Sequence, residues 1–306
     1  MGIVVIGAVF VDVKGFPEGA FVPTGRNAGS VIQIHGGVGR NVAEDVANCE
    51  LRPTFVSLVD DTGAGMDVIQ KLQRHKVNTD YIRAVPNGMG TWLAVFDNNG
   101  DVYASVSRRP DLRPIGDILD EQGDAIFRDA DSIIIEIDLD KDVVKRVFKL
   151  AKEYGKKVFA VVSNMTIALE RRDFLQSVDC LICNVQEAGV LFSEDYSEMK
   201  PEQLKLIVAE KVRRARIPGM IVTMGGDGAV YADQSGVNGW CPARKVAVRD
   251  TTGAGDAFAA GASIGLTYGK SMEESCQIGS LLAASVIVTS DSVCPRFRPE
   301  ELGLDL

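Results

Sequence analysis

The stretch Asp250-Thr251-Thr252-Gly253-Ala254-Gly255-Asp256 decides the fold, because it runs directly into the small-residue helical pattern of residues 257–261. The backbone N–H groups at a helix start are unpaired and carry partial positive charge, so they attract anions. Gly253 and Gly255 lack side chains and allow this backbone to approach a phosphate closely. The stretch therefore predicts a phosphate-binding helix start. The plainer alternative is a capped helix with an aspartate in its first turn.

Asp256 is the unusual residue of this stretch, because a carboxylate beside an anion hole repels phosphate. Its presence indicates a second role, in which it accepts the proton of an attacking hydroxyl group. No Gly-Lys-Ser/Thr sequence follows, so the stretch is not a Walker A loop.

The composition is that of an ordinary globular protein, with one large domain or a large domain and a small one. The chain has 306 residues, of which 46% are hydrophobic and 25% are charged. A net charge of −9 argues against a nucleic-acid partner or an anionic membrane surface. No apolar run reaches about 18 residues, so no transmembrane helix is expected. Phosphate binding must then depend on local backbone donors and on metal ions.

Six cysteines, without a signal peptide ahead of them, predict reduced thiols in a cytoplasmic protein. Cys180 and Cys183 have the spacing of a redox or zinc pair, but they lie in an apolar run that is typical of a buried strand. His35 and His75 are far from each other and from any cysteine pair. A structural zinc site is therefore not expected.

The alternation of apolar runs with helical patterns predicts a parallel sheet with helical crossovers. The run from Gly2 to Phe10 is typical of a strand covered on both faces. Asp12 follows at its C-terminal end, where ligands gather in open α/β sheets. Further strands are expected at 54–59, 132–135, 157–162, 178–183 and 220–224, and helices at 38–49, 201–215 and 276–288.

Two β-rich pieces without helices interrupt this pattern, at about residues 13–34 and 88–109. The second contains the hairpin signal Asp97-Asn98-Asn99-Gly100-Asp101, in which Asn-Gly accepts positive φ angles. The two pieces predict one small sheet over the active site.

A second glycine-rich motif, Gly36-Gly37-Val38-Gly39-Arg40-Asn41-Val42-Ala43, opens the expected helix at 38–49. Its glycine pair allows the backbone to approach a ligand. Asn41 would lie in the first turn, where its amide suits vicinal hydroxyl groups. The glycine spacing alone is a weak dinucleotide fingerprint, and Asn41 argues against that interpretation.

Together the two motifs resemble those of the ribokinase-like (PfkB) family of carbohydrate and nucleoside kinases. The resemblance runs from about Ile3 to about Val288. It implies a doubly wound, mainly parallel α/β sheet within one kinase domain over residues 1–306. The small sheet would be the lid of this domain. Because the lid of the family often also makes the dimer contact, the resemblance implies a homodimer.

The resemblance also assigns roles at the phosphate end of the site. Asp256 is expected to be the catalytic base. The backbone N–H groups of Gly253, Ala254 and Gly255 are expected to stabilise the charge of the γ-phosphoryl group that ATP transfers.

Asn184-Val185-Gln186-Glu187 matches the Asn-x-x-Glu motif of the family, in which the glutamate holds Mg²⁺ through water and the asparagine contacts nucleotide phosphates. The alternative is a structural N-cap, since asparagine caps helices well. The strand and glycine-rich turn that follow Met220 resemble one wall of the ATP site of the family, although the same residues would also suit a simple hairpin. The nucleotide contacts expected on this wall are Thr223, Gly225, Gly226 and Gly228.

Asp250 and Thr252, with the backbone near Ile287 and Ser292, match the positions at which relatives bind a monovalent cation such as K⁺. The glycine usual near Ser292 is missing here. At the sugar end, the resemblance makes Asp12, Gly37 and Asn41 contacts of the ring hydroxyls. Arg40 either reaches a base carbonyl of a nucleoside or points to solvent.

Within the family, Gly-Gly-Val-Gly-Arg-Asn at 36–41 and the match from Met224 to Trp240 resemble the pseudouridine kinases. They imply phosphorylation of pseudouridine to pseudouridine 5′-phosphate, although segments 105–113 and 161–164 depart from that pattern. The alternatives are another ribonucleoside or a furanose such as ribose or fructose. A catalytically inactive, ligand-sensing relative is a different class, against which the intact Asp256, Asn184 and Glu187 argue.

Overall fold

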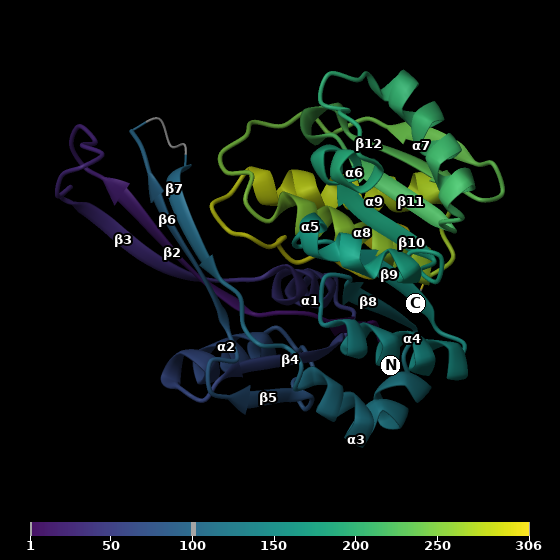
Figure 1. The fold of residues 1–306 in the computed structure, drawn as a ribbon, viewed down its shortest axis with the longest axis horizontal. Coiled ribbons are helices and arrows are strands. Elements are labelled where there is room, and N and C mark those ends of the chain that lie inside the picture. The colour runs from purple at the N-terminus through teal and green to yellow at the C-terminus, as the bar shows by residue number, and fades with distance from the viewer. Residues whose placement is uncertain (1, 99–101, 306) are drawn as a thin grey trace.

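A nine-stranded sheet forms the centre of the computed structural model, which describes residues 2–98 and 102–305 (Figure 1). The strand order is β13-β12-β11-β10-β9-β8-β1-β4-β5. All neighbours from β11 to β5 pair in parallel, whereas β12 and β13 run antiparallel. The strands are β1 Val4–Ile6, β4 Thr54–Asp60, β5 Ile82–Val85, β8 Ser132–Glu136, β9 Lys157–Val161, β10 Cys180–Asn184, β11 Gly219–Thr223, β12 Ala229–Asp233 and β13 Asn238–Cys241.

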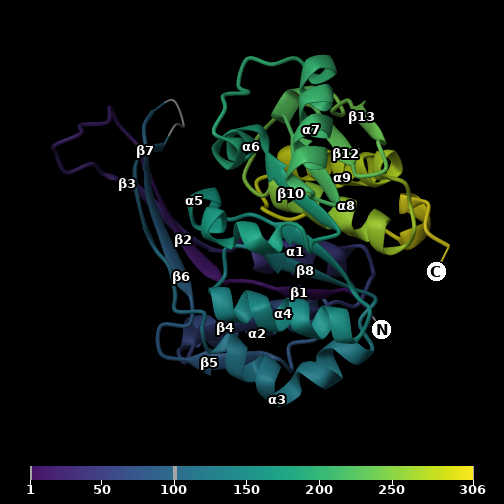
Figure 2. The same cartoon turned by 45° about the vertical axis from the view of Figure 1, so that its right-hand side comes forward.

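Helices cover both faces of this sheet (Figure 2), and successive strand residues point alternately into two apolar cores. Val4 and Ile6 of β1, for example, pack into one core, and Val5 packs into the other. The first core is closed by α3 Ile115–Arg128, α4 Lys141–Glu153, α5 Met165–Ala168, α6 Val185–Phe192 and α7 Pro201–Ala215. The second is closed by α1 Val38–Asn48, α2 Gly63–Arg74, α8 Ala254–Thr267 and α9 Met272–Ile287. The doubly wound, mainly parallel fold is thus confirmed.

The 3-10 turns are η1 Leu169–Phe174, η2 Gly225–Asp227 and η3 Pro299–Leu302. Over the residues that the structure describes, no helix combines the length and the apolar content that a membrane span requires.

A second, four-stranded sheet projects from the body beside the C-terminal ends of the parallel strands (Figure 1). Its order is β3-β2-β6-β7, with β2 Phe10–Pro17, β3 Gly29–Gly36, β6 Gly90–Phe96 and β7 Val102–Arg108. The two β-rich pieces of the sequence therefore do join in one small sheet. The hairpin of β6 and β7 is antiparallel, as expected, and residues 99–101 of its turn lie outside the described residues.

The expectation of one continuous strand from Gly2 to Phe10 is wrong. The parallel strand ends at Ile6, and the chain enters the small sheet at Phe10. The buried carboxylate of Glu136 causes the break, because its Oε1 accepts the N–H of Ala8 at 2.9 Å and draws the backbone out of the ladder. Asp12 consequently lies within β2 and does not end a strand of the large sheet.

Close packing of α8 against α9 fixes the position of the helix that begins at the Asp250–Asp256 stretch. At Gly261, a Cβ atom would lie 2.8 Å from the Cα atom of Gly279, so the two helices touch through backbone. The run of small residues in α8 is therefore a packing requirement, and it holds the N-terminus of α8 rigidly beside the sheet edge.

A matched pair of glycines tests the turn between β11 and β12. Gly228 has φ 95°, and a Cβ atom there would lie 2.1 Å from the carbonyl oxygen of Cys241, whereas Gly226 has open space around it. Gly228→Ala should lower the free energy of unfolding by about 1–3 kcal/mol. Gly226→Ala should lower it by less than about 0.5 kcal/mol in the same urea titrations. Equal losses in the two variants would contradict this account of the turn.

Candidate active site

The N-terminus of α8 leaves backbone N–H groups open to an anion. Its N-cap, Gly253, has φ 82°, and a Cβ atom at this residue would lie 2.0 Å from the carbonyl oxygen of Ser292, so only glycine fits. The side of Gly255 is open, with no atom within 4 Å of a Cβ position. The N–H of Ala254 is already bonded to the carbonyl of Thr251 at 3.2 Å. The N–H groups of Gly253 and Gly255 have no acceptor among the described residues, so these two remain available to a phosphate.

Asp256 lies in the first turn of α8, half-buried, and is held by Asn41 from α1. Nδ2 of Asn41 donates to Oδ2 of Asp256 at 2.6 Å. Burial raises the pKa of Asp256 to about 6, and the negative charge of Asp12 adds to this rise. The hydrogen bond from Asn41 and the positive charge of Arg40 oppose it. A carboxylate with such a pKa is ionised at pH 7 yet basic enough to accept a proton.

Asp12 and the glycine pair lie on the small-sheet side of the same crevice. The carboxylate of Asp12 lies against Gly36, where a Cβ atom would be 2.4 Å from Oδ2. Gly37 has φ 97°, and its Cβ position is 2.6 Å from the carbonyl oxygen of Ala8. Burial raises the pKa of Asp12, while the charges of Lys14 and Arg40 oppose the rise. The fold thus brings Asp12, Gly37 and Asn41 together with Asp256.

Arg40 differs from both expectations for its side chain, because it neither points to solvent nor presents a free head group to a base. The residue is fully buried, and its Nη1 donates to Oε2 of Glu44 at 2.6 Å. Its Nη2 donates to the carbonyl of His35 and to Oγ of Ser292, the latter at 3.3 Å. Arg40 therefore holds the segment before the glycine pair and the loop beside Gly253 in place.

Asn184 and Glu187 form a reciprocal capping box at the start of α6. Oδ1 of Asn184 accepts the N–H of Glu187, and Oε2 of Glu187 accepts the N–H of Asn184, both at 2.8 Å. Asn184 is therefore the N-cap of α6, as the structural interpretation predicted, but capping leaves one polar atom of each side chain without a partner among the described residues. Nδ2 of Asn184 and Oε1 of Glu187 have no hydrogen-bond partner in the described chain.

Glu187 lies among other carboxylates, an environment that would favour a cation. Burial raises the pKa of Glu187, and the carboxylates of Asp138 and Asp256 raise it further. Within residues 2–98 and 102–305, no group of three or more histidine, cysteine or acidic side chains could hold a metal by itself. Mg²⁺ is commonly bound through one or two carboxylates, water and substrate phosphates, so this donor set fits it.

The expected nucleotide wall lies next to Asn184. Thr223 is the register partner of Asn184 across β10 and β11, and its Oγ1 donates to the carbonyl of Cys183 at 3.5 Å. Gly225 and Gly226 follow with open space around them. Gly228, by contrast, is required by the close approach of Cys241 described above, whatever else it contacts.

Some of the oxygen atoms expected to bind a monovalent cation already accept hydrogen bonds. Oδ1 of Asp250 accepts the N–H of Thr252 at 2.8 Å. The carbonyl of Ile287 accepts the N–H groups of Arg249 and Asp250, at 2.7 and 3.3 Å. The carbonyl of Ser292 faces Gly253. These residues do not fit a cation well as they stand.

Three charged residues of this edge were not found from the sequence. Glu136 is buried at the end of β8, where burial raises its pKa to about 8, and it also accepts the N–H of Gly39 at 2.5 Å. Asp138 is paired with Arg109 at 2.7 Å and lies near Glu187. Lys14 is 5% exposed and forms no ion pair with a described residue. The sequence signal available for the two acids was their position at or just after the end of a buried apolar run. The position of Lys14 in β2 offered no such sequence signal.

Comparison with known proteins gives consistent results. Residues 2–295 match the model of the pfkB family carbohydrate kinases. The chain is 33% identical to a guanosine-inosine kinase of Exiguobacterium acetylicum over 292 residues, 95% of each chain. It is 27% identical to a pseudouridine kinase of Escherichia coli over 261 residues, 85% of this chain and 82% of the other. A ribokinase structure of Arabidopsis thaliana with ribose and ATP superposes with a TM-score of 0.81 at 22% identity, covering 96% of each chain, and shows the shared fold.

The raised pKa of Asp256 has a consequence for stability. Because the folded-state pKa of about 6 exceeds the usual value of 3.8, this residue lowers stability as pH rises from about 4 to about 6, and the loss is complete above that range. Asp256→Asn should therefore raise the free energy of unfolding at pH 7.5 by about 1–2 kcal/mol, after a discount for partial solvent access. At pH 4 the gain should vanish.

Urea titrations at the two pH values measure this difference, and Asp61→Asn, at an exposed carboxylate, is the control. A gain that is the same at both pH values, or that Asp61→Asn reproduces, would contradict the assignment of a raised pKa to Asp256.

Proposed function

The chain belongs to the PfkB family of carbohydrate kinases, phosphotransferases that act on hydroxyl groups of sugars or nucleosides, and we propose that it transfers the γ-phosphoryl group of ATP to the primary hydroxyl of a ribonucleoside. The observation that carries the proposal is the pairing of Asp256 with the free N–H groups of Gly253 and Gly255. A carboxylate base and free backbone N–H groups within one helix turn suit phosphoryl transfer to a hydroxyl group, since the base accepts the proton of the hydroxyl and the N–H groups stabilise the phosphoryl oxygens.

In the proposed mechanism, Asp256 accepts the proton of the attacking hydroxyl as the new O–P bond forms. Asn41 fixes one carboxylate oxygen, which leaves Oδ1 of Asp256 to face the acceptor. The N–H groups of Gly253 and Gly255 stabilise charge on the phosphoryl oxygens. Lys14, buried and without an ion pair among the described residues, adds a positive charge on the facing small sheet.

The nucleotide is expected along β10 and β11. The free Nδ2 of Asn184 would donate to its phosphates, and the open backbone at Gly225 and Gly226 would lie against it. Mg²⁺, when bound through water at the free oxygen of Glu187, would neutralise charge on the phosphates. An unchanged Mg²⁺ requirement in Glu187→Gln would remove that residue from this role. No step is assigned to K⁺, because the carbonyl of Ile287 is already saturated.

The first candidate substrates are guanosine and inosine. The relative that acts on them matches 95% of this chain at 33% identity, against 85% at 27% for the pseudouridine kinase. Pseudouridine is the second candidate, supported by the glycine motif at residues 36–41 and the match from Met224 to Trp240. For either nucleoside, Asp12 would hold the ring hydroxyls. Asn41 is already hydrogen-bonded to Asp256 and to Ser292, and Arg40 is already hydrogen-bonded to Glu44.

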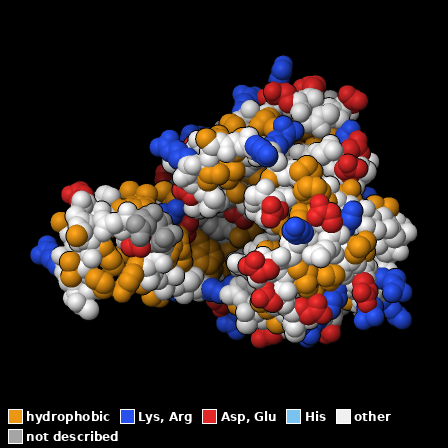
Figure 3. Space-filling model, turned by 90° about the horizontal axis from the view of Figure 1, so that it is seen from above, with side chains coloured by type: hydrophobic (Ala, Val, Ile, Leu, Met, Phe, Trp, Pro, Cys, Tyr) orange, Lys and Arg blue, Asp and Glu red, His pale blue; other side chains and the backbone are white. Residues whose placement is uncertain are grey.

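The small sheet is proposed to be both a lid and a dimer contact within a single kinase domain. From above, it forms a lobe that a hollow separates from the body, and orange apolar side chains cover much of it (Figure 3). The exposed apolar residues include Val31, Tyr103 and Val106, at 71, 54 and 68% exposure. A patch of this kind marks an interaction site. A monomeric sedimentation coefficient at micromolar concentration would exclude the pairing.

A reducing, cytoplasmic location, expected from unpaired thiols, remains part of the proposal.

A substrate panel tests the proposed function. With Mg-ATP, guanosine and inosine should give kcat/KM values at least about tenfold above those of pseudouridine and ribose. The corresponding 2′-deoxyribonucleosides should lose about 1–3 kcal/mol of transition-state stabilisation, because the partly buried carboxylate of Asp12 is left without its hydroxyl partner. ADP release and product mass are the measurements.

Asp12→Ala is the matched variant, since it should weaken nucleoside use while it leaves the affinity for ATP unchanged. If pseudouridine is the best acceptor, the second candidate replaces the first. If ribose or fructose exceeds every nucleoside, the nucleoside proposal is wrong.

A further inference from the structure

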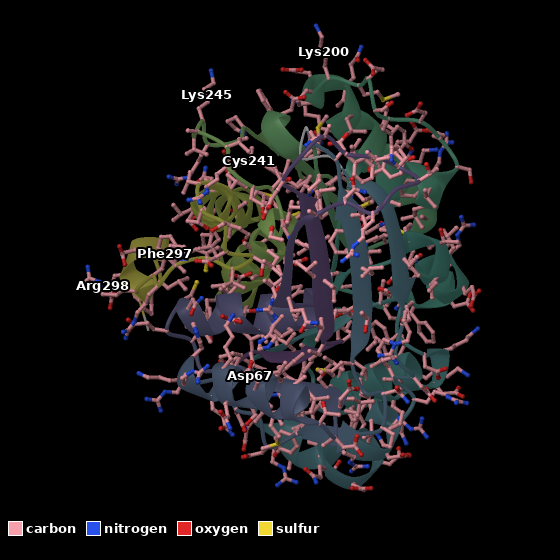
Figure 4. The ribbon with its side chains drawn as sticks, turned by 90° about the vertical axis from the view of Figure 1, so that its left-hand side faces the viewer. Asp67, Lys200, Cys241, Lys245, Phe297 and Arg298 are labelled. Atoms are coloured by element: carbon pink, nitrogen blue, oxygen red, sulfur yellow. The ribbon has the colours of Figure 1, made fainter. Side chains whose placement is uncertain are left out.

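A cavity separate from the site of Asp256 lies where α1, α2 and residues 289–296 meet. Its volume is about 820 Å³, within the range of small-molecule sites, and Asp12, Asn41 and Asp256 do not line it. In Figure 4, Asp67 marks the α2 side of this region and Phe297 marks the C-terminal segment above it. None of the roles assigned so far uses this cavity.

The floor of the cavity carries a hydrogen-bond acceptor without a donor. Glu44 lines the cavity with its side chain 1% exposed, and its Oε1 has no hydrogen-bond partner among residues 2–98 and 102–305. Nζ of Lys71 and Nε2 of His75 lie 3.2 and 3.5 Å away, close enough for charge attraction but not in hydrogen-bond geometry. Burial opposes ionisation of Glu44, but the charges of Arg40 and Lys71 prevail and keep its pKa below the usual value. A buried, ionised acceptor of this kind favours a ligand with N–H donors.

The rim of the cavity carries positive charges without partners. Arg52, Arg74 and Lys76 line it, and in the described part of the chain none of them forms an ion pair. This is notable in a chain of net charge −9. Free guanidinium groups at a cavity mouth suit a phosphate group, which they can bind in a bidentate manner.

The floor is connected to the catalytic base by a continuous chain of contacts. Oε2 of Glu44 accepts from Arg40 at 2.6 Å, and Arg40 donates to Oγ of Ser292 at 3.3 Å. Oγ of Ser292 donates to Oδ1 of Asn41 at 3.5 Å, and Asn41 holds Asp256. A ligand that displaces Glu44 would act on the group that positions the base. By linkage, occupancy of either site then changes affinity at the other.

We propose that this cavity binds a nucleoside monophosphate, with the N–H groups of its base on Glu44 and its phosphate at Arg74 and the neighbouring rim cations. Such a ligand is the product of the reaction proposed above, and in that respect the inference rests on the proposed function. The cavity is then a site through which product acts on Asp256.

The experiment is titration calorimetry of GMP into the full-length protein without ATP, so that its outcome does not depend on kinase activity. Arg74→Glu reverses a rim charge in the last turn of α2. Arg213→Glu is the matched control, because Arg213 is an exposed arginine in the last turn of α7, away from the cavity. Both substituted residues are exposed and form no ion pair with a described residue, so the variants are expected to fold, and unfolding midpoints verify this.

Wild type and Arg213→Glu should bind GMP at two sites per chain, the cavity and the acceptor site beside Asp256. Arg74→Glu should bind GMP at least about tenfold more weakly at one of the two sites, because a charge-assisted hydrogen bond contributes an effect of this size. Guanosine alone and inorganic phosphate alone should each bind the cavity at least about tenfold more weakly than GMP. No GMP binding by the wild type, equal binding by Arg74→Glu and Arg213→Glu, or phosphate binding as tight as that of GMP would overturn the proposal. A single GMP site that Arg74→Glu weakens would support the cavity site and would instead count against guanosine as the acceptor.

Discussion

The hydrogen bond between Asn41 and Asp256 is the contact on which the rest of the site depends. It joins the first turns of α1 and α8, which are 215 residues apart in the chain, and it places the amide of one motif on the carboxylate of the other. The bond uses Oδ2 of Asp256 and leaves Oδ1 without a hydrogen-bond partner among the described residues. Burial raises the pKa of Asp256 while this bond lowers it, so the two effects together set its basicity.

Two ion pairs hold part of the buried charge around this contact. Arg40 and Glu44 neutralise each other beneath the glycine pair, and Arg109 neutralises Asp138. Glu136 has no cation in contact among the described residues. Burial and the neighbouring charge of Asp138 raise its pKa to about 8, although the hydrogen bonds from the N–H groups of Ala8 and Gly39 oppose the rise. Lys14 remains as a buried cation without a described partner, opposite the N-terminus of α8. This imbalance suits a site whose missing charge arrives with the substrate.

The fold and much of the site follow from local sequence patterns. The two glycine motifs, the buried strand runs and the helix at Pro201–Ala215 each have a local physical cause, so their positions could be predicted. The break after Ile6 could not, because it depends on Glu136, which is 128 residues from Ala8. The burial of Arg40 likewise depends on Ser292, far along the chain, as well as on Glu44. At Asn184 and Glu187 the capping interpretation is confirmed, because one oxygen of each side chain caps the helix. The remaining polar atom of each side chain has no partner among the described residues, and its role toward a nucleotide or Mg²⁺ stays a prediction.

The central claim is that Asp256 is the base for phosphoryl transfer, and the turnover number of Asp256→Asn tests it most directly. The variant keeps the size of the side chain and an oxygen that can accept from Asn41, so the fold and ATP binding should persist. With the best acceptor of the panel, its kcat should fall by at least about 10²-fold relative to wild type, the usual contribution of a general base. A kcat within a few-fold of wild type would contradict the account.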